Sequence, residues 1–419
     1  MAVQTISQNT TSRTRVTTGA VLLVIGVLVF LLFVPGTESG QTVKFGMNLI
    51  SSAALKIPDL ILPVQASLYA LSFVIVFLGA FQMARGIRSP GALFGIVAFA
   101  FVAAFLIWAT KGKSLSLIGM LSSSLVRATP IALAALCGVI SERAAVVNIG
   151  IEGIMLIAAQ ASVVSATLSG NMYIGLFVGI FAGALVGAFH AFLCIRFKVD
   201  QIVSGVAINI FATGATSFIS SKYLQHQGEL LNNSGTFPIL PIPLLSKIPI
   251  LGPILFENNL IVYLTLLIVV VLHIVLYYTP WGLRTRAVGE HPKAADTLGI
   301  NVFFVRYVNV IIGGMIAGLG GAYFTLGSVG RFDEVMTAGK GFIGLAAMIF
   351  GNWNPIGAFT SSLIFGFADS LQIKMQILAV PIPSSILAMA PYIVTMIVLT
   401  GVVGRAIPPA ADGVAYEKQ

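Results

Sequence analysis

The chain has 419 residues, of which 57% are apolar and 9% are charged, and its mean hydropathy is +0.99. Such a composition excludes an ordinary water-soluble domain. Apolar runs of roughly 20 residues recur along the whole chain, which is the length that a helix needs to cross a hydrocarbon core of about 30 Å. The runs lack the in–out alternation of a membrane barrel. The sequence therefore predicts an all-α, polytopic transmembrane helical bundle.

The formal net charge of +9 does not require a nucleic-acid partner, because basic residues on the inner face of a membrane protein contact anionic membrane lipid. Arginine and lysine concentrate in three short turns, at 85–88, 196–198 and 284–306. The positive-inside rule places these turns in the cytoplasm.

Twelve candidate spans follow one another along the chain. They are 18–34, 62–84, 91–110, 115–140, 144–168, 172–197, 201–221, 259–279, 304–328, 338–352, 355–373 and 384–403. The first follows a polar start without a clear cleavage site, so we interpret it as an uncleaved span with a cytoplasmic N-terminus. Two others are unusual, since 201–221 is rich in Ser, Thr, Asn and Gly and 338–352 has only about 15 residues. Either is a candidate for a broken or re-entrant element that lines a cavity, so we expect about 10–12 spans.

Three parts of the chain are expected. Residues 1–90 form an N-terminal cytoplasmic tail with extra spans, residues 91–405 form the main transmembrane domain with a cytoplasmic loop at 280–303, and residues 406–419 form a cytoplasmic tail. The long external loop at 222–258 is rich in proline, which favours a stiff and extended path. It is as readily a mere connector as a docking surface for an external protein.

The segment 281–300 is a charged island between two apolar runs. Pro292 suits the first position of a helix and Gly299 suits the position just past its end, so the sequence predicts a short helix over 293–298. One or two helical turns are unstable alone. The membrane domain must therefore hold this helix on one side and a partner on the other. An ordinary solvated loop is the alternative.

Polar side chains inside the apolar runs are candidates for a solute path. Asn148 and Glu152 are four residues apart, so they share one face of a helix. A carboxylate in a span costs roughly 2.5–3.5 kcal/mol, so it faces a bundle interior or an aqueous cavity. Glu152 is predicted to accept hydrogen bonds from sugar hydroxyls or base amino groups. The alternative is a structural partner for Arg143 or for a backbone donor.

The remaining path candidates are neutral. Gln201, Ser204, Asn209 and Asn354 carry groups that both donate and accept hydrogen bonds, which suits an uncharged, hydroxyl-rich solute. The alternative for each is a polar contact between helices.

Three other features of the apolar runs are interpreted as packing. Asp369 is expected to pair with Lys374, and His190 is expected to be a satisfied packing residue in a helix rich in Gly and Ala. The glycines spaced four apart from 175 to 187 share one helix face, where they contact either neighbouring helices or a paired subunit.

The charged island resembles a known motif. Ala294-Ala295-x-x-x-Gly299 is similar to the core of the cytoplasmic loop by which permeases of ABC importers dock on their ATPase, with Lys293 where many of them have Glu. The segment 289–295 is close to the version found in permeases for ribose, branched-chain amino acids and nucleosides.

Three further motifs resemble one subtype of these permeases, that of nucleosides and simple sugars. In chain order they are 140–153, 199–209 and 341–355. Together the resemblance covers about 115–403.

The resemblance implies a permease subunit of an ABC importer in the bacterial cytoplasmic (inner) membrane, which moves solute by alternating access. A separate cytoplasmic ATPase subunit would hold ATP and Mg, so no cofactor is expected in this chain. The other implied partners are a second homologous permease subunit (or a second copy of this chain), an external solute-binding protein and membrane lipid. The residues implied to couple the chain to the ATPase are Glu290, Pro292, Lys293, Ala294, Ala295 and Gly299.

The resemblance implies a nucleoside as the first substrate and a simple sugar such as ribose as the second. Branched-chain amino acids are less favoured, because they need a site for both an ammonium and a carboxylate and the path candidates are mostly neutral. An ion-coupled secondary transporter that uses Glu152 and Asp369 is the alternative mechanism. An enzyme is not expected, because no convergent catalytic set is recognisable. Residues 112–114 match only the end of an ATP-binding loop motif, whose first glycine is missing from this sequence.

Overall fold

The computed structural model describes residues 2–49, 57–87, 90–380, 382–389 and 406–418. Within this part of the chain, ten helices are long and apolar enough to cross a membrane, which confirms the predicted fold class. They are α1 (Ala2–Phe33), α2 (Val64–Ala84), α3 (Pro90–Ala109), α4 (Leu117–Glu142), α5 (Ile151–Ser169), α6 (Met172–Ala191), α7 (Gln201–Ile219), α10 (Leu260–Tyr278), α13 (Val302–Ala322) and α15 (Pro355–Ile377). Three of these continue into π-helical turns: η1 (Phe192–Arg196), η2 (Ser220–Leu224) and η4 (Tyr323–Val329).

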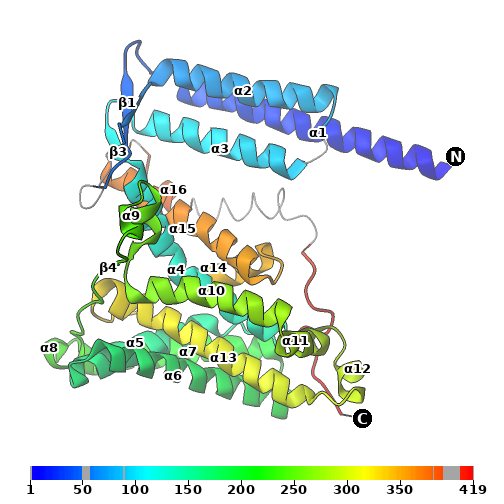
Figure 1. Ribbon diagram of the computed structural model, residues 1–419, viewed down its shortest axis with the longest axis vertical. Coiled ribbons are helices and arrows are strands. Elements are labelled where there is room, and N and C mark those ends of the chain that lie inside the picture. The colour runs from blue at the N-terminus through cyan, green and yellow to red at the C-terminus, as the bar shows by residue number, and fades with distance from the viewer. Residues whose placement is uncertain (1, 50–56, 88–89, 381, 390–405, 419) are drawn as a thin grey trace.

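The long helices run side by side, and most of the shorter elements, α14 excepted, gather at their two ends (Figure 1). The short strands lie at one end of the bundle, which we call the strand end. The opposite end, which we call the α12 end, holds α11 (Pro280–Glu290), α12 (Pro292–Thr297) and the end of the chain. Helices α1 to α3 form a separate layer. Strand β1 (Thr42–Gly46) joins this layer to the start of α4, because it pairs antiparallel with β2 (Leu60–Pro63) and parallel with β3 (Ser114–Ser116).

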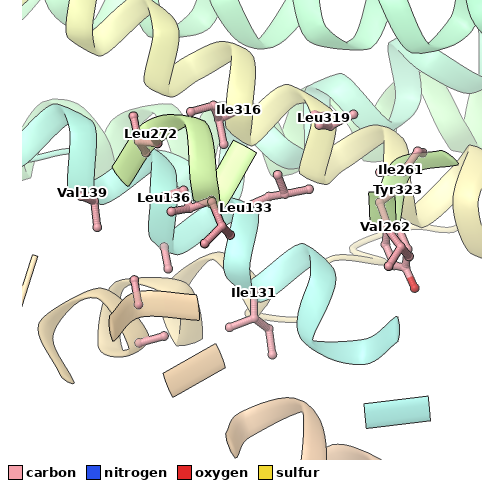
Figure 2. Packing of buried hydrophobic residues seen from close by; sticks show 14 of the residues in the cluster. Ile131, Leu133, Leu136, Val139, Ile261, Val262, Leu272, Ile316, Leu319 and Tyr323 are labelled. Carbon is pink, nitrogen blue, oxygen red and sulfur yellow. The ribbon is translucent and has the colours of Figure 1, made fainter. Parts of the chain in front are cut away.

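Helix α4 is the centre of the main bundle, since every residue from Ala128 to Glu142 is buried. Figure 2 shows its side chains meeting those of two other helices. Leu133 and Leu136 of α4 lie in one buried cluster with Leu272 of α10 and with Ile316 and Leu319 of α13. A helical segment that is largely apolar and covered on every side, as this second half of α4 is, requires such a central position.

The glycines of α6 allow a close approach to α13. A Cβ on Gly183 would lie 2.3 Å from the carbonyl oxygen of Gly314, and one on Gly318 would lie 2.6 Å from that of Gly179. These glycines therefore pack against a helix of the same chain, which confirms the packing interpretation. A paired subunit has no room to contact the row at these positions.

The two unusual spans differ from each other. Residues 201–221 are not broken, because α7 continues directly into the π-helical turn η2. Residues 338–352 do contain a short element, α14 (Lys340–Phe350), whose 11 residues extend only about 16 Å. The middle of α14 packs against the middle of α4, where a Cβ on Gly344 would lie 2.4 Å from that of Ala134. The last candidate span, 384–403, lies mostly outside the described residues; its start forms α16 (Ser384–Ala388).

The loop at 222–258 is folded rather than extended. It contains α8 (Gly228–Leu231), the 3-10 turn η3 (Leu245–Lys247) and α9 (Leu251–Leu255), and β4 (Leu240–Pro241) pairs with β5 (Glu257–Asn258). The predicted extended path is wrong, because the chain turns back at Leu244 and Ile250, which both have positive φ.

Candidate functional site

The charged island forms two consecutive helices at the α12 end. Thr279 caps α11, and His291 caps α12 by accepting the N–H of Ala294 on its Nδ1 at 3.1 Å. Pro292 occupies the start of α12, where the missing N–H has no cost. The helix predicted over 293–298 is thereby confirmed as Pro292–Thr297.

Gly299 ends α12 by adopting a backbone conformation that favours glycine. Its φ is +82°, in the left-handed region that a glycine adopts without strain. Its N–H donates to the carbonyl of Asp296 at 2.9 Å, and the N–H of Ile300 donates to that of Ala295 at 3.1 Å. These two bonds close the helix and satisfy its last carbonyls.

Helix α12 has one buried side and one open side. Ala295 is 3% exposed and packs with Val288, Val302 and Val305. By contrast, Leu298 is 82% exposed. The side chains of Lys293, Ala294 and Thr297 are also exposed.

The structure therefore brings together all six residues that were predicted to couple the chain to an ATPase. Sequence reasoning did not single out Leu298, although an apolar residue directly before the terminal glycine of a polar island was a usable signal. The carboxylate of Glu290 is exposed and accepts the N–H of Ala410 at 3.2 Å.

The carboxylate of Glu152 caps the amino end of α14. Its Oε1 accepts the hydroxyl of Thr337 at 2.6 Å and the N–H of Gly339 at 2.8 Å, and its Oε2 accepts the N–H of Gly341 at 2.6 Å. A carboxylate at this position also interacts favourably with the helix dipole. Backbone donors were the predicted alternative for Glu152. Arg143 is not its partner.

Three residues of α7 fasten the loop at 143–150, which precedes α5. Gln201 accepts the N–H of Val147 at 2.6 Å, and the side-chain amide of Asn209 donates to the carbonyl of Ile149 at 2.9 Å. The hydroxyl of Ser204 lies 3.0 Å from Nδ1 of His190, whose Nε2 lies 3.0 Å from the carbonyl oxygen of Val147. The predicted packing role of His190 agrees with these contacts.

Asn148 lies in the middle of this loop and is fully buried. Its amide donates toward the sulfur of Cys137 at 3.6 Å, while its Oδ1 has no hydrogen-bond partner among the described residues. Asn354 lies apart from this group, between α14 and α15, where it accepts the N–H groups of Ile356 and Gly357 as the cap of α15. Five of the six path candidates are thus close together, and their contact with solute stays a prediction.

A hollow of about 440 Å³ between α5, α6 and α7 is almost wholly apolar. Its lining includes Ile157, Leu185, Phe189 and Phe211, and Ser204 contributes a hydroxyl. Such a lining suits lipid chains better than a hydroxyl-rich solute.

Asp369 does not pair with Lys374 as predicted. Its Oδ2 lies 3.1 Å from Nζ of Lys340 and 3.4 Å from Nη1 of Arg127. The reason is that α14 starts beside α4 and α15, which brings the cation of Lys340 to the carboxylate. Charges inside a bundle pair with one another because isolated charges there are costly.

Residues 120–404 match a protein family described as branched-chain amino acid transport system / permease component. The chain belongs to this permease family. As a permease with ten apolar helices in its described part, it is a multi-pass protein of the bacterial inner membrane. The match begins within α4, so the layer of α1 to α3 precedes it. Whether the chain divides at 90 and 405 stays a prediction.

Curated relatives of this permease are themselves transport proteins. It is 44% identical over 308 residues to the guanosine ABC transporter permease protein NupQ of Bacillus subtilis, which covers 71% of this chain and 95% of that protein. It is 42% identical over 308 residues to the nucleoside ABC transporter permease protein NupC of Lactococcus lactis, covering 71% and 96%. It is 37% identical over 265 residues to the putative glucose ABC transporter permease protein TsgC13 of Haloferax volcanii, covering 62% and 79%. No solved structure matches the chain.

Membership of this family identifies the chain as the permease subunit of an ABC importer. Its relatives are named as permease components of ABC transporters, which work with an ABC ATPase and a solute-binding protein.

Proposed function

We propose that this permease carries nucleosides into the cell. The observation that supports this substrate is the identity of 44% and 42% to a guanosine permease and a nucleoside permease, each matched over nearly its whole length. A simple sugar is the second candidate, because the relative named as a putative glucose permease is 37% identical over 79% of its length.

The coupling of transport to ATP hydrolysis is assigned to α12. We propose that the ATPase, which holds ATP and Mg, binds the open side of α12 and that Leu298 is the apolar anchor of this contact. A leucine that is 82% exposed beside Lys293 and Ala294 has the character of an interface anchor, which fills a pocket of its partner. The α12 end is therefore the cytoplasmic end. The permease domain pairs with a homologous subunit or with a second copy of this chain.

The solute path is assigned to the region around the loop at 143–150. We propose that Glu152, Gln201, Ser204, Asn209 and Asn354 shape the path by holding this loop, α14 and α15 in place, as their hydrogen bonds suggest. Asn148 is the residue proposed to contact solute, since its Oδ1 is an acceptor without a partner among the described residues. An acceptor of this kind suits a hydroxyl or an amino group.

The test is uptake into proteoliposomes that contain the permease, its ATPase and its binding protein. We expect ATP-dependent uptake of radiolabelled guanosine or another nucleoside, with no competition from excess glucose or ribose. Uptake of a sugar and not of nucleosides would replace the proposed substrate by the second candidate. Uptake driven by an ion gradient in the absence of the ATPase would overturn the ABC mechanism. A second test addresses the docking of the ATPase. Leu298→Asp should abolish copurification of the ATPase, while the permease remains in the membrane.

A further inference from the structure

The C-terminal strap, residues 406–418, is a non-helical segment that lies beside α12 (Figure 1). Two of its contacts attach it to the end of α11. The N–H of Ala411 donates to the carbonyl of Gly289 at 2.9 Å, and the N–H of Ala410 donates to the carboxylate of Glu290 at 3.2 Å. The strap is therefore attached directly before the start of α12.

Tyr416 of the strap lies against the buried side of α12. It is 6% exposed and shares an apolar cluster with Ala295 and Val302, and its ring centroid lies 5.3 Å from that of Phe303. Of the six residues of α12, all of which the structure describes, Ala295 alone is buried. A helix this short is not stable by itself, so the position of α12 depends on the cluster that Tyr416 completes.

Further contacts attach the strap to two membrane-spanning helices. Arg306 of α13, which is 2% exposed, donates to the carbonyl of Val414 at 3.0 Å. The carboxyl group of Asp412 lies beside that of Glu142 at the end of α4, and a proton on either one allows a hydrogen bond between them. Oε2 of Glu142 also accepts the indole N–H of Trp353 at 2.5 Å, in the turn between α14 and α15. The strap thus reaches, through one carboxylate, the turn that follows α14.

That turn has an unusual backbone. Asn352 and Trp353 have φ values of +52° and +53°. Asparagine tolerates this left-handed region, but tryptophan keeps it only where its surroundings fix it. Arg143 fixes it by donating to the carbonyl of Trp353 at 2.9 Å and to that of Asn352 at 3.1 Å. The shape of the turn therefore depends on the end of α4, where Asp412 is bound.

We propose that the C-terminal strap is a positioning element of the transport cycle, which links α12 to the turn between α14 and α15. Movement imposed on α12 by the ATPase reaches α14 through Tyr416, Asp412 and the end of α4. The role of the strap rests on the proposed docking of the ATPase on α12. Tyr416 is a positioning residue, because it touches α12 and α13 and neither solute nor ATP.

The experiment measures solute uptake and ATP hydrolysis together in proteoliposomes that contain the complete transporter. For Tyr416→Ala we expect the ATPase to copurify and to hydrolyse ATP, while guanosine uptake per ATP hydrolysed falls about tenfold or more. Tyr416→Phe keeps the ring against Phe303 and loses only the hydroxyl beside Asp296 of α12, so the ratio should fall less than in Tyr416→Ala. Tyr278→Ala is the matched control, since Tyr278 is 76% exposed near the same end and its loss should leave the ratio unchanged. An unchanged ratio in Tyr416→Ala would overturn the proposal.

A second comparison separates coupling from general damage. Ala295→Gly removes the α12 side of the same contact. In the double variant, uptake per ATP should therefore fall by less than the product of the two single falls. Independent, multiplying effects would contradict a shared contact. If Tyr416→Ala fails to accumulate in the membrane, Tyr416→Leu replaces it in both comparisons with the same two outcomes.

The two proposals about α12 fail in different measurements. If Leu298→Asp leaves the ATPase bound, the docking role of α12 is wrong. If the ATPase is lost in Leu298→Asp but the uptake ratio of Tyr416→Ala is normal, the docking role stands and the role of the strap is wrong.

Discussion

Glu152 in α5 holds the first turn of α14 through Gly341, whose backbone N–H lies 2.6 Å from Oε2 of the carboxylate. The same glycine leaves room for this contact, since a Cβ on Gly341 would lie 2.6 Å from that oxygen. A helix that begins inside the bundle leaves backbone N–H groups without partners. Glu152 supplies the acceptors from a neighbouring helix, so the carboxylate and the short helix require each other.

We expect Glu152→Ala to destabilise the permease by about 1–3 kcal/mol, because buried backbone donors lose their acceptor. Glu152→Gln keeps one oxygen acceptor and should have a smaller effect. The midpoint of thermal unfolding in detergent measures both, with Glu38→Ala at an exposed position as the control. An unchanged midpoint in Glu152→Ala would show that the cap does not stabilise α14.

Two kinds of feature differ in how far the sequence could predict them. The helix at Pro292 and its end at Gly299 were predictable, because the signals for helix ends lie within a few residues of each other. The partner of Glu152 was not, since Gly341 is 189 positions away in the chain.

Pairing by nearness in sequence was also misleading. Lys374 is close to Asp369 along the chain, yet Lys340, 29 positions away, makes the ion pair. Likewise, nothing in the composition of the tail signalled that Tyr416 would pack under α12. Such contacts depend on how helices are placed relative to one another, which local patterns do not encode.

Substitution of Gly299 tests the end of α12 through the backbone alone. A Cβ on Gly299 would have no atom within 4 Å, so any effect comes from its φ of +82°. We expect Gly299→Val to cost about 1–2 kcal/mol locally and to lower ATP-driven uptake strongly. Gly299→Asn should retain most uptake, because asparagine tolerates the left-handed region. Equal uptake by the two variants would contradict this explanation.

The contact between α6 and α13 tolerates no added methyl group at Gly183. Because its Cβ would lie 2.3 Å from the carbonyl oxygen of Gly314, we expect Gly183→Ala to separate the helices and cost about 1–3 kcal/mol. Gly214→Ala is a matched control on α7, since a Cβ there would have no atom within 4 Å. Thermal unfolding in detergent should show a lower midpoint for Gly183→Ala and an unchanged midpoint for Gly214→Ala. Equal midpoints would mean that α6 and α13 adjust without cost.

Attachment of the C-terminal strap should weaken as pH rises. Burial raises the pKa of Asp412 to about 6, against the opposing effects of the hydrogen bond with Glu142, the N–H of Gly413 and the charge of Arg306. A raised pKa means that the attached strap binds a proton more tightly than the free strap does. Raising the pH from the ordinary value of 3.8 through about 6 therefore removes stability from the attached state, and the loss is complete above that range.

Hydrogen–deuterium exchange of residues 406–418 measures this dependence. After correction for the intrinsic exchange rates, the strap should be better protected at pH 5 than at pH 8. Asp412→Asn cannot ionise at this position and still offers an amide donor to Glu142, so its protection should change less between the two values than that of the unmodified strap. Equal protection of the unmodified strap at both values would show that the proton on Asp412 does not contribute to attachment. Greater protection at pH 8 would mean that the ionised carboxylate, paired with Arg306, is the form that holds the strap.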